Sequence, residues 1–369
     1  MNLKHRALSL LCIGTLLTGL LSGCGGPGTD FDGTNKSSGN HDTLRLYIWG
    51  EYTGENLIEN FEDAYDCRVI VETFDSNEMM YTKISSGDSY DVLVPSDYMI
   101  ERLLKEEYLQ SLDREVITNF DQLDPAVVGL PYDSDNTYSI PYFWGTVGIV
   151  YNKNKVDYAD LEKEGWNILT DRKYENKLYL YDSERDSFMM ALKALGYSMN
   201  TDKEEEINAA YEWLCNINNT MHPVYVTDEI IDNMINGTKD IGIVYSGDAA
   251  YILSENPDMG YYCPKEGTNI WSDAMVIPKN APNPELANEF INYVLSYDAS
   301  YDNTETVGYT SSNAEVAADV YASGTYQGNE AYMPRSDYDK DEVFRDNEYL
   351  RQRLSELWIK VKAGSTVKK

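Results

Sequence analysis

Strand-like and helix-like hydrophobic patterns alternate along the chain from residue 44 onward. Short apolar runs rich in β-branched residues predict strands, and apolar residues spaced three and four apart predict helices. In the first part of the chain the predicted strands are 44–49, 68–74 and 91–94, and the predicted helices are 54–65, 77–85 and 96–106. This strand–helix alternation favours a parallel α/β sheet.

A second series of the same kind follows residue 142. Its predicted strands are 147–151, 177–181, 240–245 and 274–277, and its predicted helices are 188–195, 204–217, 284–295 and 341–362. Two series predict two α/β lobes and a hinged cleft, with a ligand at the carboxyl ends of strands. The pattern contains no internal repeat.

The first residues have the pattern of an export signal. Two basic residues precede an apolar stretch, residues 7–21, that is too short for a comfortable membrane span. The stretch ends in Leu-Ser-Gly-Cys24, which resembles a bacterial lipobox. That resemblance implies a signal peptide of residues 1–23 and a diacylglycerol group on Cys24, hence an extracytoplasmic protein anchored to the cell membrane. The alternative is an ordinary secretory signal with a chance cysteine.

The segment after the signal differs from the rest of the chain. Residues 24–42 are rich in Gly, Ser, Asn and Asp, and Phe31 is their only bulky apolar residue. Such a segment cannot bury a core, so it is predicted to be a flexible tether.

Charge and hydropathy exclude several classes of protein. The 369 residues include 30 Lys+Arg and 62 Asp+Glu, for a net charge of −32, and the mean hydropathy is −0.48. These values exclude a multi-span membrane protein and a generic nucleic-acid binder, which needs clustered basic residues. They are compatible with a small cationic ligand. The 31 tyrosines are an unusual surplus whose purpose composition does not explain.

The cysteines indicate neither zinc nor a disulfide framework. Outside the signal and the lipobox only Cys67, Cys215 and Cys263 remain, far apart and without a partner spacing typical of zinc sites. We predict that they are small buried hydrophobic residues, although one disulfide among them stays open. No metal and no cofactor are predicted.

Eight short blocks resemble the spermidine/putrescine-binding proteins of polyamine ABC transporters. They occur in family order at residues 46–52, 74–81, 90–98, 139–145, 191–198, 264–267, 270–273 and 307–309. The resemblance implies an α/β, two-lobed type 2 periplasmic-binding-protein fold with a hinged ligand cleft. It implies an N-terminal lobe of 43–149 plus 273–319 and a C-terminal lobe of 150–272 plus 320–369. The implied partners are putrescine or spermidine and the ABC permease and ATPase subunits, with no nucleic acid.

The same resemblance implies a site that combines carboxylates with aromatic rings. A desolvated ammonium group needs a carboxylate partner, and aromatic faces attract cations while covering methylene groups. In the family Asp273 corresponds to the principal ammonium partner, Glu51 to a polar contact and Tyr309 to a hydrogen-bonding residue near an amine. The full set of implied ligand-binding positions is Trp49, Glu51, Tyr52, Ser96, Tyr98, Asp186, Tyr245, Trp271, Asp273 and Tyr309. Trp49 could instead cap the core, and Ser96 could also be a helix N-cap.

The chain departs from the family at three of the relevant positions. Asp186 stands where the family more often has Glu, and Tyr245 stands where it often has Trp. Ser183 replaces an Asp of the best-known spermidine binders, and Asp182 or Glu184 could take over that carboxylate or simply begin a helix. One carboxylate fewer predicts a preference for the shorter ligand, putrescine, at equal or better affinity than spermidine.

Two other functions remain open from the sequence. A protein of the same fold could bind a different organic cation. A secreted hydrolase that uses two acids is less well supported, because the sequence lacks Gly-x-Ser-x-Gly, His-Glu-x-x-His and Walker motifs. Outside the signal peptide only His41 and His222 are present, and His41 lies in the tether. We therefore expect a binding protein and not an enzyme.

Overall fold

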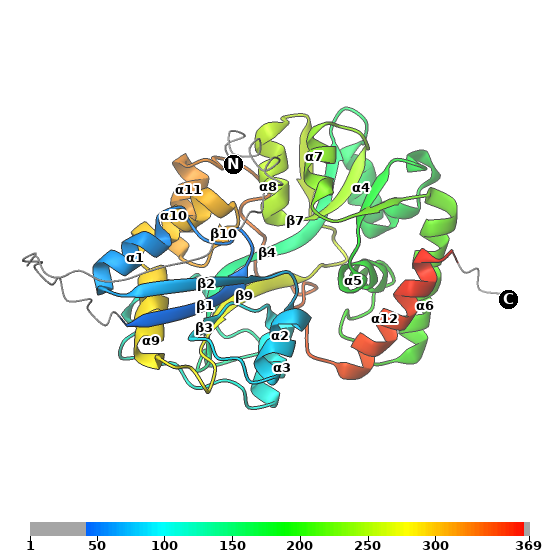
Figure 1. The fold of residues 1–369 in the computed structure, drawn as a ribbon. Helices are drawn as coiled ribbons and strands as arrows, with labels where there is room; N and C mark the ends of the chain where they lie inside the picture. The colour runs from blue at the N-terminus through cyan, green and yellow to red at the C-terminus, as the bar shows by residue number, and fades with distance from the viewer. Residues whose placement is uncertain (1–41, 365–369) are drawn as a thin grey trace, which may run out of the picture. The chain divides into compact units, whose positions relative to one another are not determined.

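One curled sheet organises residues 42–364, the part of the chain that the computed structural model describes (Figure 1). The strand order is β2-β1-β3-β9-β4-β7-β5-β6, and β8 and β10 also pair with β4. The strands are β1 (Thr43–Trp49), β2 (Arg68–Phe74), β3 (Val92–Leu93), β4 (Ser139–Asn152), β5 (Leu178–Tyr181), β6 (Val224–Val226), β7 (Ile241–Tyr245), β8 (Met259–Tyr262), β9 (Ile270–Val276) and β10 (Thr310–Ser311). The predicted signal peptide, Cys24 and nearly all of the predicted tether lie outside the described residues.

Helices cover the sheet at both ends of β4 (Figure 1). They are α1 (Leu57–Tyr65), α2 (Asn77–Ser85), α3 (Asp97–Lys105), α4 (Tyr158–Glu164), α5 (Glu184–Ala194), α6 (Glu204–Met221), α7 (Glu229–Ile235), α8 (Ser246–Glu255), α9 (Pro284–Val294), α10 (Tyr297–Val307), α11 (Ala314–Ser323) and α12 (Glu348–Lys362). No helix within residues 42–364 combines the length and the hydropathy that a membrane span requires.

The predicted parallel sheet is confirmed only for part of the strands. β1 pairs in parallel with β2 and β3, and β5 pairs in parallel with β6 and β7. β4, however, is antiparallel to β7, β8, β9 and β10. All fourteen residues of β4 are buried, and the strand links the two groups of parallel strands.

Several predicted boundaries differ from the observed ones, and two of the differences have identifiable reasons. The strand predicted at 147–151 begins at Ser139, because Pro141 lies at an irregularity in the pairing with β9, where proline is tolerated within a sheet. The helix predicted at 341–362 begins only at Glu348, where Asn347 caps it by accepting a hydrogen bond from the Leu350 amide. The residues before Asn347 are held in irregular structure by side chains, as when Asp341 binds Arg335 at 2.6 Å.

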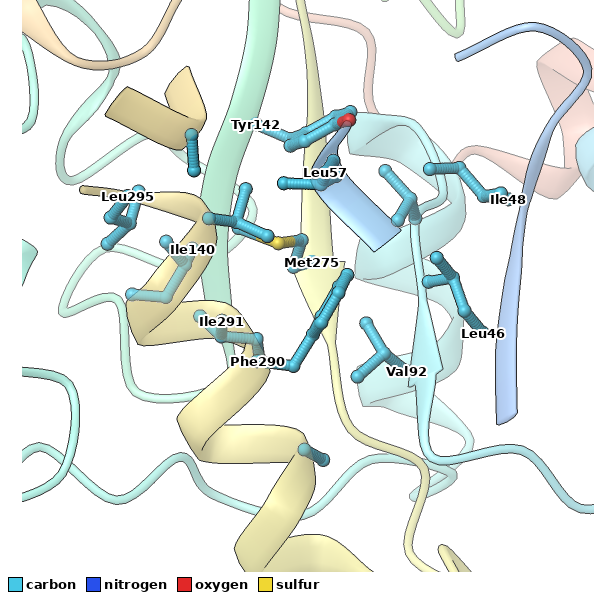
Figure 2. Packing of buried hydrophobic residues seen from close by; sticks show 14 of the residues in the cluster. Leu46, Ile48, Leu57, Val92, Ile140, Tyr142, Met275, Phe290, Ile291 and Leu295 are labelled. Atoms are coloured by element: carbon cyan, nitrogen blue, oxygen red, sulfur yellow. The ribbon is translucent and has the colours of Figure 1, made fainter. Parts of the chain in front are cut away.

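A hydrophobic core lies between α9 and the strands beneath it (Figure 2). Phe290 and Ile291 of α9 belong to the same buried cluster as Met275 of β9 and Val92 of β3. At the edge of this cluster the Tyr142 hydroxyl donates a hydrogen bond of 2.7 Å to the carbonyl oxygen of Tyr52. The core therefore fixes the loop that follows β1.

The sequence left open one disulfide among Cys67, Cys215 and Cys263. Cys67 and Cys263 are free thiols, so neither takes part in such a disulfide. Cys67 is buried, as predicted for a small hydrophobic residue, whereas Cys263 is partly exposed.

Candidate functional site

Four aromatic rings form a row across the middle of the sheet. The ring centroids of Tyr52 and Tyr309 are 5.8 Å apart, those of Tyr309 and Trp271 are 5.2 Å apart, and those of Trp271 and Tyr245 are 6.1 Å apart. All three contacts are edge-to-face, the arrangement that aromatic quadrupoles favour. We call these four residues the aromatic row.

Separate chain segments deliver the rings to this row. Tyr52 lies in the loop after β1, Tyr245 is the last residue of β7, and Trp271 is the second residue of β9. Tyr309 follows Gly308, which ends α10 with φ 88°. Because this left-handed conformation is strained for residues with a Cβ, Gly308 is what allows the chain to leave α10 toward Tyr309.

Each tyrosine of the row donates its hydroxyl hydrogen bond to a different aspartate. Tyr52 binds Asp273 at 2.7 Å, Tyr245 binds Asp186 at 2.8 Å, and Tyr309 binds Asp248 at 3.0 Å. Asp273 and Asp186 are only 7% and 4% exposed. Three carboxyl groups therefore lie along the row, and in these hydrogen bonds the partner of each is a neutral hydroxyl group and not a cation.

Burial makes these carboxyl groups weaker acids than usual. Burial raises the pKa of Asp273 to about 6, although hydrogen bonds from Ser96 and Tyr52 oppose the rise. Burial likewise raises the pKa of Asp248 to about 7 against the hydrogen bond from Tyr309. The pKa of Asp186 is raised by burial as well. A cation placed among them would favour their ionised forms.

Ser96 connects this site to a neighbouring polar group. It forms an isolated antiparallel bridge with Asp273, and its Oγ accepts a hydrogen bond of 3.1 Å from Asn77. Ser96 occupies the N-cap position of α3, but its side chain does not cap that helix. Asn77 also donates to the Tyr98 hydroxyl at 3.0 Å. Ser96 therefore lies beside Asp273, and Tyr98 is joined to Ser96 through Asn77.

Trp49 and Glu51 are joined to the aromatic row by no hydrogen bond or ring contact within residues 42–364. The Trp49 ring packs on Phe74 with centroids 4.5 Å apart, and its Nε1 is buried without a hydrogen-bond partner in the described chain. Glu51 is exposed in the following turn with φ 53°. The other predicted positions are brought together.

The departure at Ser183 has a local structural role. Its Oγ accepts a hydrogen bond from the Asp186 amide at 3.4 Å, which caps α5. Asp182 pairs with Lys362 at 2.7 Å and therefore faces α12. Asp182 does not replace the missing carboxylate at the aromatic row.

Sequence reasoning missed Asp248 and Tyr181. Asp248 lies in the first turn of α8, where an acid is ordinary because it complements the helix dipole, so the sequence carried no distinctive signal. Tyr181 ends β5, and its ring centroid is 5.1 Å from that of Tyr245. Its position at the carboxyl end of a strand parallel to β7 was a usable signal.

A narrow pocket continues the site beside Asp186. Its empty volume is ≈ 130 Å³, below the roughly 300–1,000 Å³ of a typical ligand pocket. It is lined by Val147, Tyr181, Asp186, Ile243, Val244 and Tyr245. Within residues 42–364 no group of three or more His, Cys, Asp or Glu side chains has a geometry that could hold a metal ion.

Gly247→Ala tests how tightly the aromatic row is packed. A Cβ at this position would lie 1.6 Å from Cδ1 of Tyr309, so the ring would have to move. Helix propensity alone predicts a gain of about 1 kcal/mol in the free energy of unfolding, whereas overpacking predicts a loss of about 1–3 kcal/mol. We expect the loss, measured by urea unfolding. Gly50→Ala, where a Cβ meets nothing within 4 Å, is the control, and a stabilised Gly247→Ala variant would contradict the packing.

Comparison with known proteins places this arrangement in a family. Residues 56–334 match the family described as bacterial extracellular solute-binding protein. The spermidine/putrescine-binding periplasmic protein of Salmonella typhimurium is 36% identical over 74% of this chain and 78% of its own length. The Escherichia coli protein of the same name is 33% identical over 88% of this chain and 92% of its own length.

A solved structure shares the fold. The spermidine/putrescine ABC transporter substrate-binding protein PotD from Streptococcus pneumoniae superposes with a TM-score of 0.77 at 33% identity, covering 88% of this chain and 99% of that one. The two-lobed fold predicted from the sequence is thereby confirmed. The chain belongs to the bacterial extracellular solute-binding proteins, and its relatives within that family are the spermidine/putrescine-binding proteins.

Proposed function

We propose that this protein binds a polyamine, putrescine or spermidine, along the aromatic row. The observation that carries the proposal is that three row tyrosines each donate to a different aspartate, Asp273, Asp248 and Asp186. In this proposal the carboxylates hold the ammonium groups, and the rings cover the methylene chain. Trp49, Glu51, Ser96 and Tyr98 complete the proposed site.

The chemistry of the site supports a cation with an apolar chain. An ammonium group taken out of water is costly unless a carboxylate pairs with it. A cation over an aromatic face gains roughly 0.5–2 kcal/mol. An anionic ligand would instead need basic side chains, whereas acids surround this row. The names of the relatives agree with this assignment.

We further propose that the protein is the extracytoplasmic substrate-binding component of an ABC importer and has no catalytic role. A lipid on Cys24 would anchor it to the cell membrane, and the closed ligand-bound form would be recognised by the permease and its ATPase. The lobes follow the division inferred from the sequence, with an N-terminal lobe of 43–149 plus 273–319 and a C-terminal lobe of 150–272 plus 320–369.

Isothermal titration calorimetry with putrescine and spermidine tests the binding. We expect both to bind at one site, with putrescine at equal or higher affinity because Ser183 contributes no carboxylate. Competition by a panel of quaternary amines distinguishes another organic cation as the ligand. Absence of both binding heat and a thermal shift with either polyamine would contradict the proposal, and tenfold tighter spermidine binding would contradict the preference.

A further inference from the structure

One face of α3 is polar although the helix packs against the sheet. Tyr98, Glu101 and Lys105 are spaced three and four residues apart and therefore share a face. The intervening Met99, Ile100 and Leu103 are fully buried with residues of β1, β3 and β9. α3 is thus fixed to the β1-β3-β9 part of the sheet by its apolar residues. We call Tyr98, Glu101 and Lys105 the polar stripe of α3, and contacts with the sheet do not explain it.

The stripe contacts the segment that precedes α12. Arg345 forms a fork on Glu101, with Nε at 2.9 Å from Oε2 and Nη2 at 2.7 Å from Oε1. The amide of Asp346 donates to the same Oε2 at 2.7 Å. Lys105 Nζ donates to the Asp346 carbonyl oxygen at 2.8 Å and lies 3.2 Å from its carboxylate. We call Glu101, Lys105, Arg345 and Asp346 the α3 clasp.

The segment that carries Arg345 is attached to the opposite half of the molecule. Glu342 pairs with Lys193 of α5 at 3.0 Å and accepts from the Met199 amide at 2.8 Å. Asn200 accepts from the Arg345 amide at 2.9 Å. Beyond the segment, α12 packs on α5 and α6 (Figure 1).

Val343 of the same segment is buried with the apolar residues of α3, whereas Phe344 is buried with Met189 and Met190 of α5. The clasp therefore lies where the two hydrophobic clusters meet.

A second contact lies on the same stripe, nearer the aromatic row. The Arg185 guanidinium of α5 stacks on the Tyr98 ring with its carbon 3.7 Å from the centroid. The three α3 residues on this face, Tyr98, Glu101 and Lys105, are thus each polar or charged. Charged groups can return to water when such an interface opens, whereas an apolar interface would resist opening.

We propose that the α3 clasp forms when the two lobes close on a ligand, and that it controls how fast the ligand leaves. This inference rests on the proposed polyamine-binding function and lobes. Contacts that exist only in the closed form stabilise that form and slow its opening. Glu101 is only 8% exposed, so its end of the fork is shielded from solvent, although the Arg345 side chain is 41% exposed. None of the four clasp residues hydrogen-bonds to the three aspartates at the aromatic row in the described structure.

Stopped-flow measurement of intrinsic tryptophan fluorescence with putrescine tests the clasp. Arg345→Gln and Glu101→Gln should each accelerate putrescine dissociation about tenfold with the association rate nearly unchanged, because a charge-assisted fork is lost only from the closed form. The melting temperature of the ligand-free protein should stay at the wild-type value. Arg345→Lys, which keeps the charge but loses the fork, should give an intermediate rate.

Arg353→Gln is the matched control. Arg353 makes a similar fork on Glu204, with Nη2 at 2.7 Å from Oε1 and Nε at 3.2 Å from Oε2, but this pair joins α12 to α6 within one half. Its loss should leave the dissociation rate unchanged. An Arg345→Gln variant that melts earlier without ligand yet releases putrescine at the wild-type rate would overturn the clasp. Wild-type protein that binds neither polyamine would instead overturn the proposed function, and the clasp with it.

Discussion

Asp273→Asn is expected to weaken putrescine binding by at least about 100-fold, because an ammonium group left without its buried carboxylate loses about 3–5 kcal/mol. The substitution keeps the shape of the side chain and an oxygen that can accept the hydrogen bond from Tyr52. It removes the charge. Isothermal titration at pH 8 measures the loss.

The stability of the ligand-free variant separates a lost charge from a damaged fold. Burial raises the pKa of Asp273, which means that its ionised form is disfavoured in the folded, empty site. At pH 8, where Asp273 is ionised, the neutral amide should therefore melt at the same temperature as wild type or higher. Asp182→Asn is the control, since Asp182 pairs with Lys362 on α12 and should leave putrescine affinity unchanged. Retained affinity in Asp273→Asn would remove this residue from the proposed site.

The predictable part of the site consists of residues that a strand pattern or a family motif nominates. Tyr245 ends β7, the strand predicted at 240–245, so the strand assignment together with the family resemblance was sufficient to nominate it. Trp271 and Asp273 lie on β9 but precede the strand predicted at 274–277, so the resemblance alone nominated them. Asp248 carried no such signal, because an acid in the first turn of a helix is common. What selects it is its contact with Tyr309, which lies 61 residues away in sequence.

In the fold, too, features set by local sequence could be predicted, whereas features set by contacts between distant residues could not. Strands with continuous β-branched patterns, such as β2 at Arg68–Phe74, were predicted with their observed bounds. β4 was predicted too short because Pro141 interrupts its pattern, and its antiparallel partners are set by contacts with distant strands. The α3 clasp could not be predicted, because Glu101 and Arg345 are 244 residues apart and either is an ordinary surface residue by sequence.

Putrescine affinity is expected to fall steeply as the pH is lowered from 8 to 5. A dication needs ionised carboxylates, and burial raises the pKa of Asp248 to about 7 and that of Asp273 to about 6 in the empty site. At pH 5 both carboxyl groups are protonated, so binding must release protons. Because pH 5 lies about two units below the pKa of Asp248, removing the proton from Asp248 alone weakens the affinity about 100-fold. Titration calorimetry across this range, in buffers of different ionisation enthalpy, measures both the affinity and the protons released.

The stability of the ligand-free protein should change in the opposite direction. The folded-state pKa values of both aspartates, about 6 and about 7, lie above the ordinary value of about 3.9. At pH values between the ordinary and the folded-state pKa, the folded state therefore holds more protons than the unfolded state. Their contribution to stability is fully present below about pH 4 and is lost as the pH rises through about 6 to 7. Asp248→Asn should remove the part of the affinity change centred near pH 7 and leave the part near pH 6. A wild-type affinity that is constant from pH 8 to pH 5 would mean that neither carboxylate pairs with the ligand. If a carboxyl group must lose its proton when the ligand binds, the affinity necessarily depends on pH.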